Sequence, residues 1–125
     1  MLPQIETEIE ELKKEYSNVV VNQQSDGSIY IELQDLPLPD GWNQKRASVS
    51  IILPVGYPQA PPSGFCTDLN IRLSGERMPA GAGPIDICGK KLMRFCWQTK
   101  NPWNASKEGL WKYIKLVLDR FTLLQ

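Results

Sequence analysis

Any covalent chemistry in this chain has to proceed without imidazole, because the sequence contains no histidine. That absence excludes Ser/His/Asp and Cys/His hydrolases, zinc sites that need histidine, and any histidine general base. The remaining reactive groups are those of cysteine, aspartate, glutamate, lysine, tyrosine and the backbone. Three cysteines are present, Cys66, Cys88 and Cys96, and they are the first candidates to compare.

Cys96 is the cysteine that we assign as the nucleophile. Arg94 and Lys100 lie close to it in the sequence, and basic neighbours favour the reactive thiolate. The chain has no Cys-x-x-Cys pair, which makes a redox-active dithiol the weaker interpretation. The odd number of cysteines argues against a closed disulfide framework.

Two other cysteines compete with this assignment. Cys88 is the rival nucleophile, since it lies in an irregular segment and is followed by Lys90 and Lys91. Cys66 stands beside Phe65 on a predicted strand, where we expect it to be part of the core. Free cysteine is among the most buried residue types, so the alternative that no cysteine is catalytic stays open.

Length and charge set the broad class. The 125 residues fit one domain, which we expect to span residues 1–125. The 14 basic and 14 acidic residues balance, which gives no reason to expect nucleic acid or an anionic membrane as a partner. No apolar run approaches the roughly 20 residues of a membrane span, and the N-terminus is acidic and amphipathic rather than a signal peptide. We therefore expect a cytoplasmic protein that needs no metal or cofactor.

Hydrophobic spacing predicts a helix at each end of the chain. The N-terminal helix has one apolar stripe, formed by Ile5, Ile9, Leu12 and Tyr16. The C-terminal helix is expected to begin near Lys107, and its stripe consists of Leu110, Ile114, Val117, Phe121 and Leu124.

Between the helices the period changes to two residues. Strands are predicted at 19–21, 29–34 and 47–53, and the turn signal at 25–28 joins the first two in a hairpin. The segment 68–104 shows little periodicity, apart from a short strand at 90–97. These elements predict an α+β fold, with an antiparallel meander of three or four strands packed on the C-terminal helix and an N-terminal helix beside it.

The tryptophans are predicted to differ in their roles. Trp42 lies in a polar loop, where we expect it to be exposed. We interpret Trp97, Trp103 and Trp111 as core or loop anchors rather than as a binding platform.

The stretch after the third predicted strand carries a motif. It reads Tyr57-Pro58, then two residues, then Pro61-Pro62 and Phe65. This pattern resembles the signature of ubiquitin-conjugating enzymes, and the order of elements is similar to the core of their fold.

The similarity extends to a prokaryotic branch, family E of the bacterial ubiquitin-conjugating-like proteins. The further residues that resemble this branch are Arg72-Leu73, Gly75, Pro79, Arg94-Phe95-Cys96 and Trp103. Two features depart from it. The His-Pro-Asn of the superfamily is absent, and Cys96-Trp97-Gln98 stands where the branch has Ser-Arg-His.

The resemblance implies an acyl carrier, on which a ubiquitin-like modifier forms a thioester with a cysteine before it passes to an acceptor. Cys96 matches the position of the branch's serine, and Trp103 follows seven residues later, as a tryptophan follows the catalytic cysteine in the eukaryotic enzymes. Asn101 and Asn104 are candidate oxyanion donors, with Asn104 alternatively a helix cap, and Asp86 is a candidate for polarising an acceptor amine. We expect Tyr57 to pack under the loop that carries Cys96, as part of a structural motif with Pro58, Pro61, Pro62 and Trp103.

The resemblance also implies partners. They are a ubiquitin-like protein, a ubiquitin-activating-type adenylating enzyme and a JAB-type isopeptidase, in a bacterial conjugation pathway associated with antiphage defence. The alternative is a catalytically inactive variant or RWD-like module that only docks such partners, and the loss of His-Pro-Asn favours it.

Overall fold

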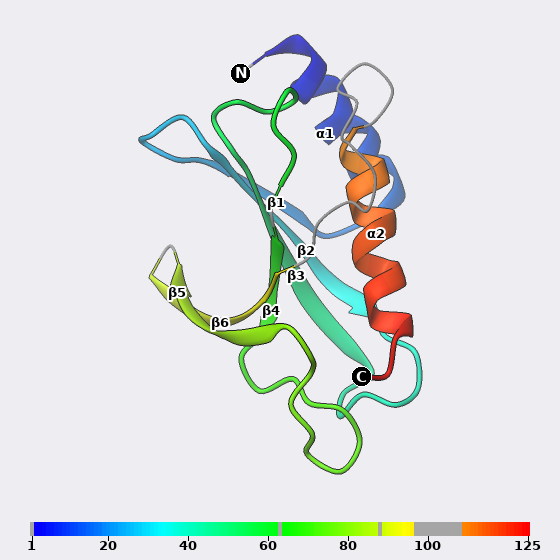
Figure 1. Ribbon diagram of the computed structural model, residues 1–125. Coiled ribbons are helices and arrows are strands. Elements are labelled where there is room, and N and C mark those ends of the chain that lie inside the picture. The colour runs from blue at the N-terminus through cyan, green and yellow to red at the C-terminus, as the bar shows by residue number, and fades with distance from the viewer. Residues whose placement is uncertain (1, 63, 88, 97–108) are drawn as a thin grey trace.

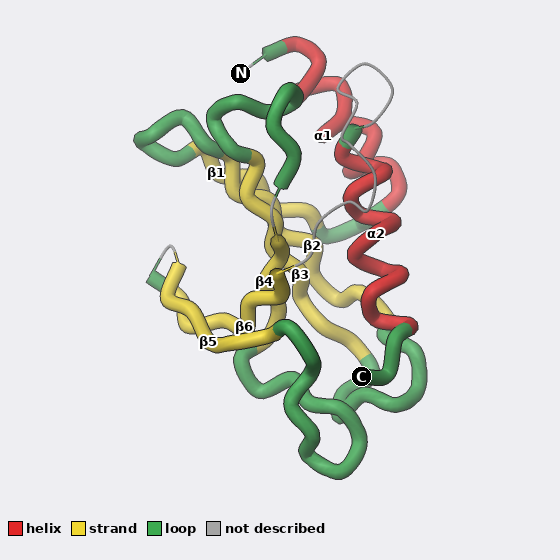
Figure 2. Tube along the Cα trace, in the orientation of Figure 1, coloured by secondary structure: helices red, strands yellow, loops and turns green. Residues whose placement is uncertain are grey.

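The chain folds into an antiparallel sheet with both helices against the same face (Figures 1 and 2). The computed structural model describes residues 2–62, 64–87, 89–96 and 109–125. The strand order in the sheet is β1-β2-β3-β4-β6-β5. In chain order the elements are α1 (Pro3–Glu15), β1 (Val19–Gln23), β2 (Ile29–Pro37), β3 (Arg46–Leu53), β4 (Gly64–Asp68), β5 (Ala82–Ile87), β6 (Lys90–Cys96) and α2 (Leu110–Thr122).

The predicted meander is confirmed in β1, β2 and β3. Val21 is opposite Ile31, which is opposite Ile51, so these three side chains share the face that the helices cover. The turn between β1 and β2 is closed by the Asp26 carboxylate, which accepts hydrogen bonds from the Ser28 backbone N–H at 2.9 Å and from its hydroxyl at 2.6 Å. These hydrogen bonds from Ser28 lower the pKa of Asp26.

The sheet is larger than predicted, with six strands in place of three or four. The predicted strand at 90–97 is confirmed as β6, which pairs with β4 on one side and β5 on the other. The sequence pattern gave no sign of β5, because this strand contains Gly83 and Pro84 and lies at the edge of the sheet. An edge strand tolerates proline, since one of its sides makes no ladder hydrogen bonds.

Both helices bury most of the apolar stripe that the sequence predicts for them, but Tyr16 is the C-cap residue of α1 and is half-buried. The buried side chains of α1 are Ile5, Ile9 and Leu12, and those of the α2 stripe are Leu110, Ile114, Val117 and Phe121. The predicted start near Lys107 lies outside the described residues, but Gly109 is extended and forms the N-cap of α2, so the helix begins at Leu110. Leu124 lies beyond the helix and is half exposed, which corrects its place in the stripe.

Two tryptophans have exposures opposite to those predicted. Trp42 is buried: its indole N–H donates to the Phe121 carbonyl at 2.8 Å, and its ring packs edge-to-face on Phe121. Trp111, which we interpreted as an anchor, is 61% exposed. Trp42 is buried although its loop is polar, because a loop that crosses the end of a core can bury a large apolar side chain. Trp111 lies one position along α2 from the buried Leu110 and therefore faces outward.

Candidate active site

Cys96 is the last residue of β6 and its side chain is exposed. Its backbone N–H donates to the Gly81 carbonyl at 3.1 Å, and its position in the sheet is opposite Gly64 of β4. The end of a strand held from both sides is a rigid support for a reactive group. Of the cysteines that the structure describes, Cys96 is the accessible one, since Cys66 is buried.

Arg94 places a permanent positive charge against the sulphur of Cys96. The two residues are two positions apart on β6, so their side chains leave the same face of the sheet. Arg94 Nη1 lies 3.2 Å from Cys96 Sγ and donates a hydrogen bond to it. The sequence-based expectation of a basic neighbour is therefore met by Arg94, while Lys100 lies outside the described residues.

An open depression of about 340 Å³ adjoins Cys96 and Arg94. Its remaining lining comes from the start of β5 and the residue before it: Gly81, Ala82, Gly83, Pro84 and Ile85. Gly83 is opposite Arg94 in the ladder, so a side chain at position 83 would share the face that carries Arg94 and Cys96. A Cβ built on Gly83 meets no atom of the described residues within 4 Å, so none of them obstructs the approach to the sulphur across β5 at this position.

A carboxylate from α1 fixes the start of α2. Glu8 Oε1 accepts a hydrogen bond from the Leu110 backbone N–H at 3.1 Å, and both Glu8 oxygens accept from the Tyr57 hydroxyl, at 3.2 and 3.1 Å. An anion at a helix N-terminus is stabilised by the unpaired N–H groups there. A Cβ at Gly109 would overlap Glu8 Oε1, so glycine at the N-cap is what allows the carboxylate to come this close.

The hydrogen bonds of Glu8 to Tyr57 and Leu110 form a bridge between α1 and the start of α2. Tyr57 is 2% exposed and is therefore a structural residue of this bridge. Burial and the neighbouring Glu8 charge raise the pKa of its phenol far above the usual value, so the hydroxyl stays protonated and donates. Pro58 and Pro62 are also buried, and Pro61 is half-buried. The loop under which Tyr57 was expected to pack lies outside the described residues, and the contact that the structure gives is with α1.

The structure separates Asp86 from Cys96, so the role predicted for Asp86 does not apply to a nucleophile at Cys96. Asp86 is opposite Lys91 in the ladder, five positions from Cys96 along β6, or about 17 Å at the usual rise of a strand. The register also puts it on the other face of the sheet, because Lys91 and Cys96 differ by an odd number of positions. Asp86 therefore does not belong to the site around Cys96.

The remaining predicted residues divide into two groups. Cys66 is buried as expected, and it lies opposite Arg94 on the side of the sheet away from the helices. The rival Cys88, the proposed oxyanion donors Asn101 and Asn104, and Trp103 lie outside the described residues.

Sequence reasoning missed Glu8 and Gly83. Glu8 is one of several glutamates on an amphipathic helix, and nothing in the pattern distinguishes it from the others. Gly83 was part of a segment without periodicity, and its significance comes only from its register with Arg94.

The described residues contain neither a metal-binding cluster nor a membrane-spanning helix. Among the residues that the structure describes, no group of three or more Cys, Asp or Glu side chains is placed to hold a metal ion. In the same part of the chain, no helix has both the length and the apolar character needed to cross a membrane.

Comparison with known protein families gives one match. The sequence model described as prokaryotic E2 family E matches residues 6–122. The chain belongs to this family. Membership relates it to ubiquitin-like conjugation and, at the level of broad class, to conjugating-enzyme-type transferases, a family that in general interacts with a ubiquitin-like protein and an activating enzyme. No curated protein and no solved structure matches the chain.

Proposed function

We propose that this family member accepts a ubiquitin-like modifier as a thioester on Cys96 and passes it to an acceptor amine in a bacterial conjugation pathway. The observation that supports this most directly is the exposed Cys96 sulphur, with Arg94 Nη1 at 3.2 Å, beside an open depression. In a chain of the E2 type, an accessible thiol at the end of a rigid strand has the properties that an acyl carrier requires.

Two substitutions at carbonyl carbon make up the proposed reaction. In the first, the Cys96 thiolate attacks the modifier's C-terminal thioester on the activating enzyme. A carbon–sulphur bond to Cys96 forms, the old carbon–sulphur bond breaks, and the activating enzyme's cysteine leaves as a thiolate. In the second, an acceptor amine attacks the same carbon, a carbon–nitrogen bond forms, Cys96 leaves as a thiolate, and the amine's proton passes to solvent.

Arg94 assists both steps in this proposal. Negative charge resides on the Cys96 sulphur before the first substitution and returns to it during the second. A guanidinium at hydrogen-bond distance stabilises that charge. We expect Arg94→Gln to slow charging about tenfold, which corresponds to the loss of one charge-assisted hydrogen bond worth about 1.5 kcal/mol.

The direct test is adduct formation with the activating enzyme, ATP and the modifier. We expect a thiol-sensitive adduct that Cys96→Ala abolishes and Cys66→Ala leaves intact. Cys96→Ser should give no adduct or one that resists reductant, because thiols cleave an oxyester less readily than a thioester. Loss of the adduct in Cys88→Ala alone would transfer the role to Cys88.

A second test addresses the approach to the sulphur. Gly83→Val adds an isopropyl group in open space on the face of Cys96, so we expect an unchanged melting temperature and at least about tenfold slower charging. Gly83→Ala should slow charging less, since it adds one methyl group. Equal rates for Gly83→Val and the parent would show that the modifier does not approach across β5.

A docking module is the second candidate function. The absence of histidine, and with it of the superfamily's His-Pro-Asn, favours this alternative. It predicts stable binding of the pathway partners and no adduct on any cysteine when the genuine partners and ATP are present.

A further inference from the structure

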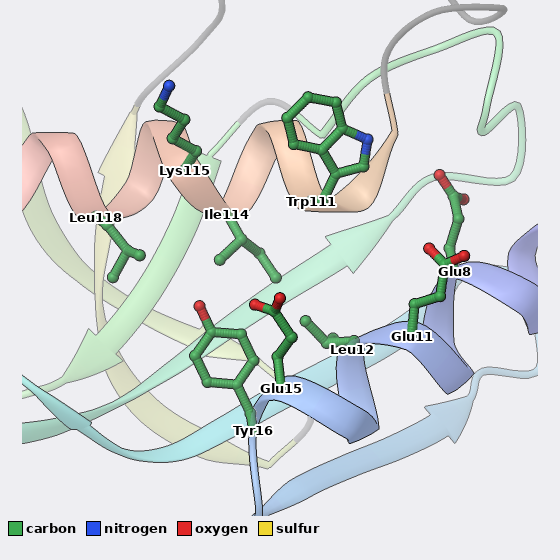
Figure 3. Close-up of a pocket in the computed structure, with 9 residues that line it drawn as sticks. All are labelled: Glu8, Glu11, Leu12, Glu15, Tyr16, Trp111, Ile114, Lys115 and Leu118. Atoms are coloured by element: carbon green, nitrogen blue, oxygen red, sulfur yellow. The ribbon is translucent and has the colours of Figure 1, made fainter.

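A groove between α1 and α2 lies outside the site around Cys96. It has a volume of about 320 Å³. Figure 3 shows the residues that line it: Glu8, Glu11, Leu12, Glu15 and Tyr16 from α1 and the residue that follows it, and Trp111, Ile114, Lys115 and Leu118 from α2.

The groove is long enough for a short helical segment. Glu8 faces the start of α2, where it accepts a hydrogen bond from the Leu110 N–H. The two helices run in the same direction (Figure 1). The lining residues extend from Glu8 to Tyr16 on one side and from Trp111 to Leu118 on the other. At the usual helical rise, each side is about 10 to 12 Å long, or about two turns.

The floor of the groove is apolar. Leu12 and Ile114 are buried, and Leu118 is half-buried. Figure 3 shows Ile114 and Leu118 pointing from α2 toward α1. Trp111 borders the groove at the start of α2; 61% of its surface is exposed to water, and its ring extends on the same side of α2 as Lys115 in Figure 3. An exposed indole beside an apolar floor is typical of a surface that another chain covers.

The rim of the groove is acidic along α1. Glu8, Glu11 and Glu15 are spaced by three and four residues, so they lie on one face of the helix. Glu8 is engaged by Tyr57 and Leu110, whereas Glu11 and Glu15 are exposed and, within the described residues, take part in no ion pair. Like charges at this spacing repel one another, and a cation between them would remove that repulsion.

Among the residues that the structure describes, the lining holds one basic side chain, Lys115, against three glutamates. Lys115 comes from α2, and Figure 3 shows its side chain pointing away from α1. The groove therefore combines an apolar floor, an aromatic border and an excess of negative charge. Trp111 adds a face on which a cationic side chain can lie.

We propose that this groove docks a basic amphipathic helix of a partner protein. Apolar side chains of the partner would cover Leu12, Ile114 and Leu118. Its lysine or arginine side chains would pair with Glu11 and Glu15 and lie over the Trp111 ring. This is helix-in-groove recognition, with the charge of the rim determining which helices bind. The proposal concerns a surface separate from Cys96 and does not depend on the proposed thioester chemistry.

A fluorescein-labelled peptide of about 14 residues, roughly four helical turns, provides the probe. Leucines at positions i, i+3, i+4 and i+7 form its apolar face, and lysines fill the other positions. The comparison peptide has glutamate in place of every lysine. Fluorescence anisotropy should show binding of the lysine peptide that weakens as salt is added, and binding of the glutamate peptide at least about tenfold weaker.

Two double variants separate a local site from general charge attraction. Glu11→Lys/Glu15→Lys reverses the rim of the groove, and Glu6→Lys/Glu10→Lys changes the net charge equally at exposed positions of α1 that do not line it. We expect the groove variant to weaken the lysine peptide at least about tenfold and the control variant to change affinity less than about twofold. Glu11→Gln/Glu15→Gln, which keeps the shape of both side chains, should give an intermediate loss.

Trp111→Ala tests the aromatic border. Because the indole is largely exposed, we expect the variant to retain its melting temperature and to bind the lysine peptide about tenfold more weakly. Equal affinity for both peptides, equal losses in the two lysine double variants, or no binding of the lysine peptide would each overturn the proposal. A dimer in sedimentation that Trp111→Ala dissociates would also overturn it, because a second copy would then be the occupant.

Discussion

Removing the Tyr57 hydroxyl is a direct test of the bridge between α1 and α2. Tyr57→Phe deletes the donor to both Glu8 oxygens and leaves the ring and its packing in place. Hydrogen bonds to charged groups contribute about 1.5 to 3 kcal/mol. The two contacts are long, at 3.2 and 3.1 Å, and Glu8 keeps its bond from the Leu110 N–H. We therefore expect a loss of about 1 to 2 kcal/mol in the free energy of unfolding.

A loss of this size is measurable by urea or thermal unfolding, followed by circular dichroism. For a domain of this length we expect the melting temperature to fall by about 4 to 8 °C. Tyr30→Phe is the matched control, because it removes the same atom from a buried tyrosine whose partner is the neutral Ser50 hydroxyl at 2.8 Å. It should cost about 0.5 to 1 kcal/mol.

A double-mutant cycle identifies Glu8 as the partner. In a Glu8→Gln background the Tyr57→Phe substitution should cost clearly less, because the charge that strengthens the bond is gone. The reasoning is refuted if Tyr57→Phe melts within about 1 °C of the parent. It is equally refuted if the cost of Tyr57→Phe is the same with and without the Glu8 charge.

Two further predictions concern alkaline stability and strand packing. Burial is the main cause that raises the pKa values of Tyr57 and Tyr113 above 10.0, so above that pH the folded state holds protons that the unfolded state has lost. Above about pH 11 stability should then fall by about 3 kcal/mol per pH unit for the two phenols together, and by half of that in Tyr57→Phe, in urea titrations between about pH 10 and about pH 12. Gly64→Ala puts a Cβ 2.5 Å from the Phe95 carbonyl oxygen, so we expect a loss of about 1 to 3 kcal/mol in urea unfolding. Gly83→Ala, whose Cβ meets no described residue within 4 Å, should unfold at the parental urea concentration, and equal midpoints for both variants would contradict this interpretation.

The sequence by itself determined the elements whose hydrophobic period is regular. The α1 stripe of Ile5, Ile9 and Leu12 is buried as its spacing predicts, and β1, β2 and β3 pair in the predicted meander. The reason is that each of these elements buries one face, so burial imposes a period of 3.6 or two residues on the sequence. The Tyr57-Pro58 and Pro61-Pro62 motif likewise resembled the family that the match over residues 6–122 confirms.

Only the tertiary structure decided the features that arise between elements. β5 has no visible period because it lies at an edge, with Gly83 and Pro84 in it. Trp42 is buried by packing on a helix that lies far along the chain, and Trp111 is exposed because it stands outside the buried stripe of α2.

The same reason applies to the candidate site and to the bridge. Cys96 was proposed from the sequence, whereas the 3.2 Å contact from Arg94 depends on side-chain conformation, and the distance to Asp86 depends on the register of β5 against β6. Glu8 was indistinguishable from its neighbouring glutamates until the fold placed it against Tyr57. Contacts between residues that are distant in sequence leave no local pattern, so only the packed chain can show them.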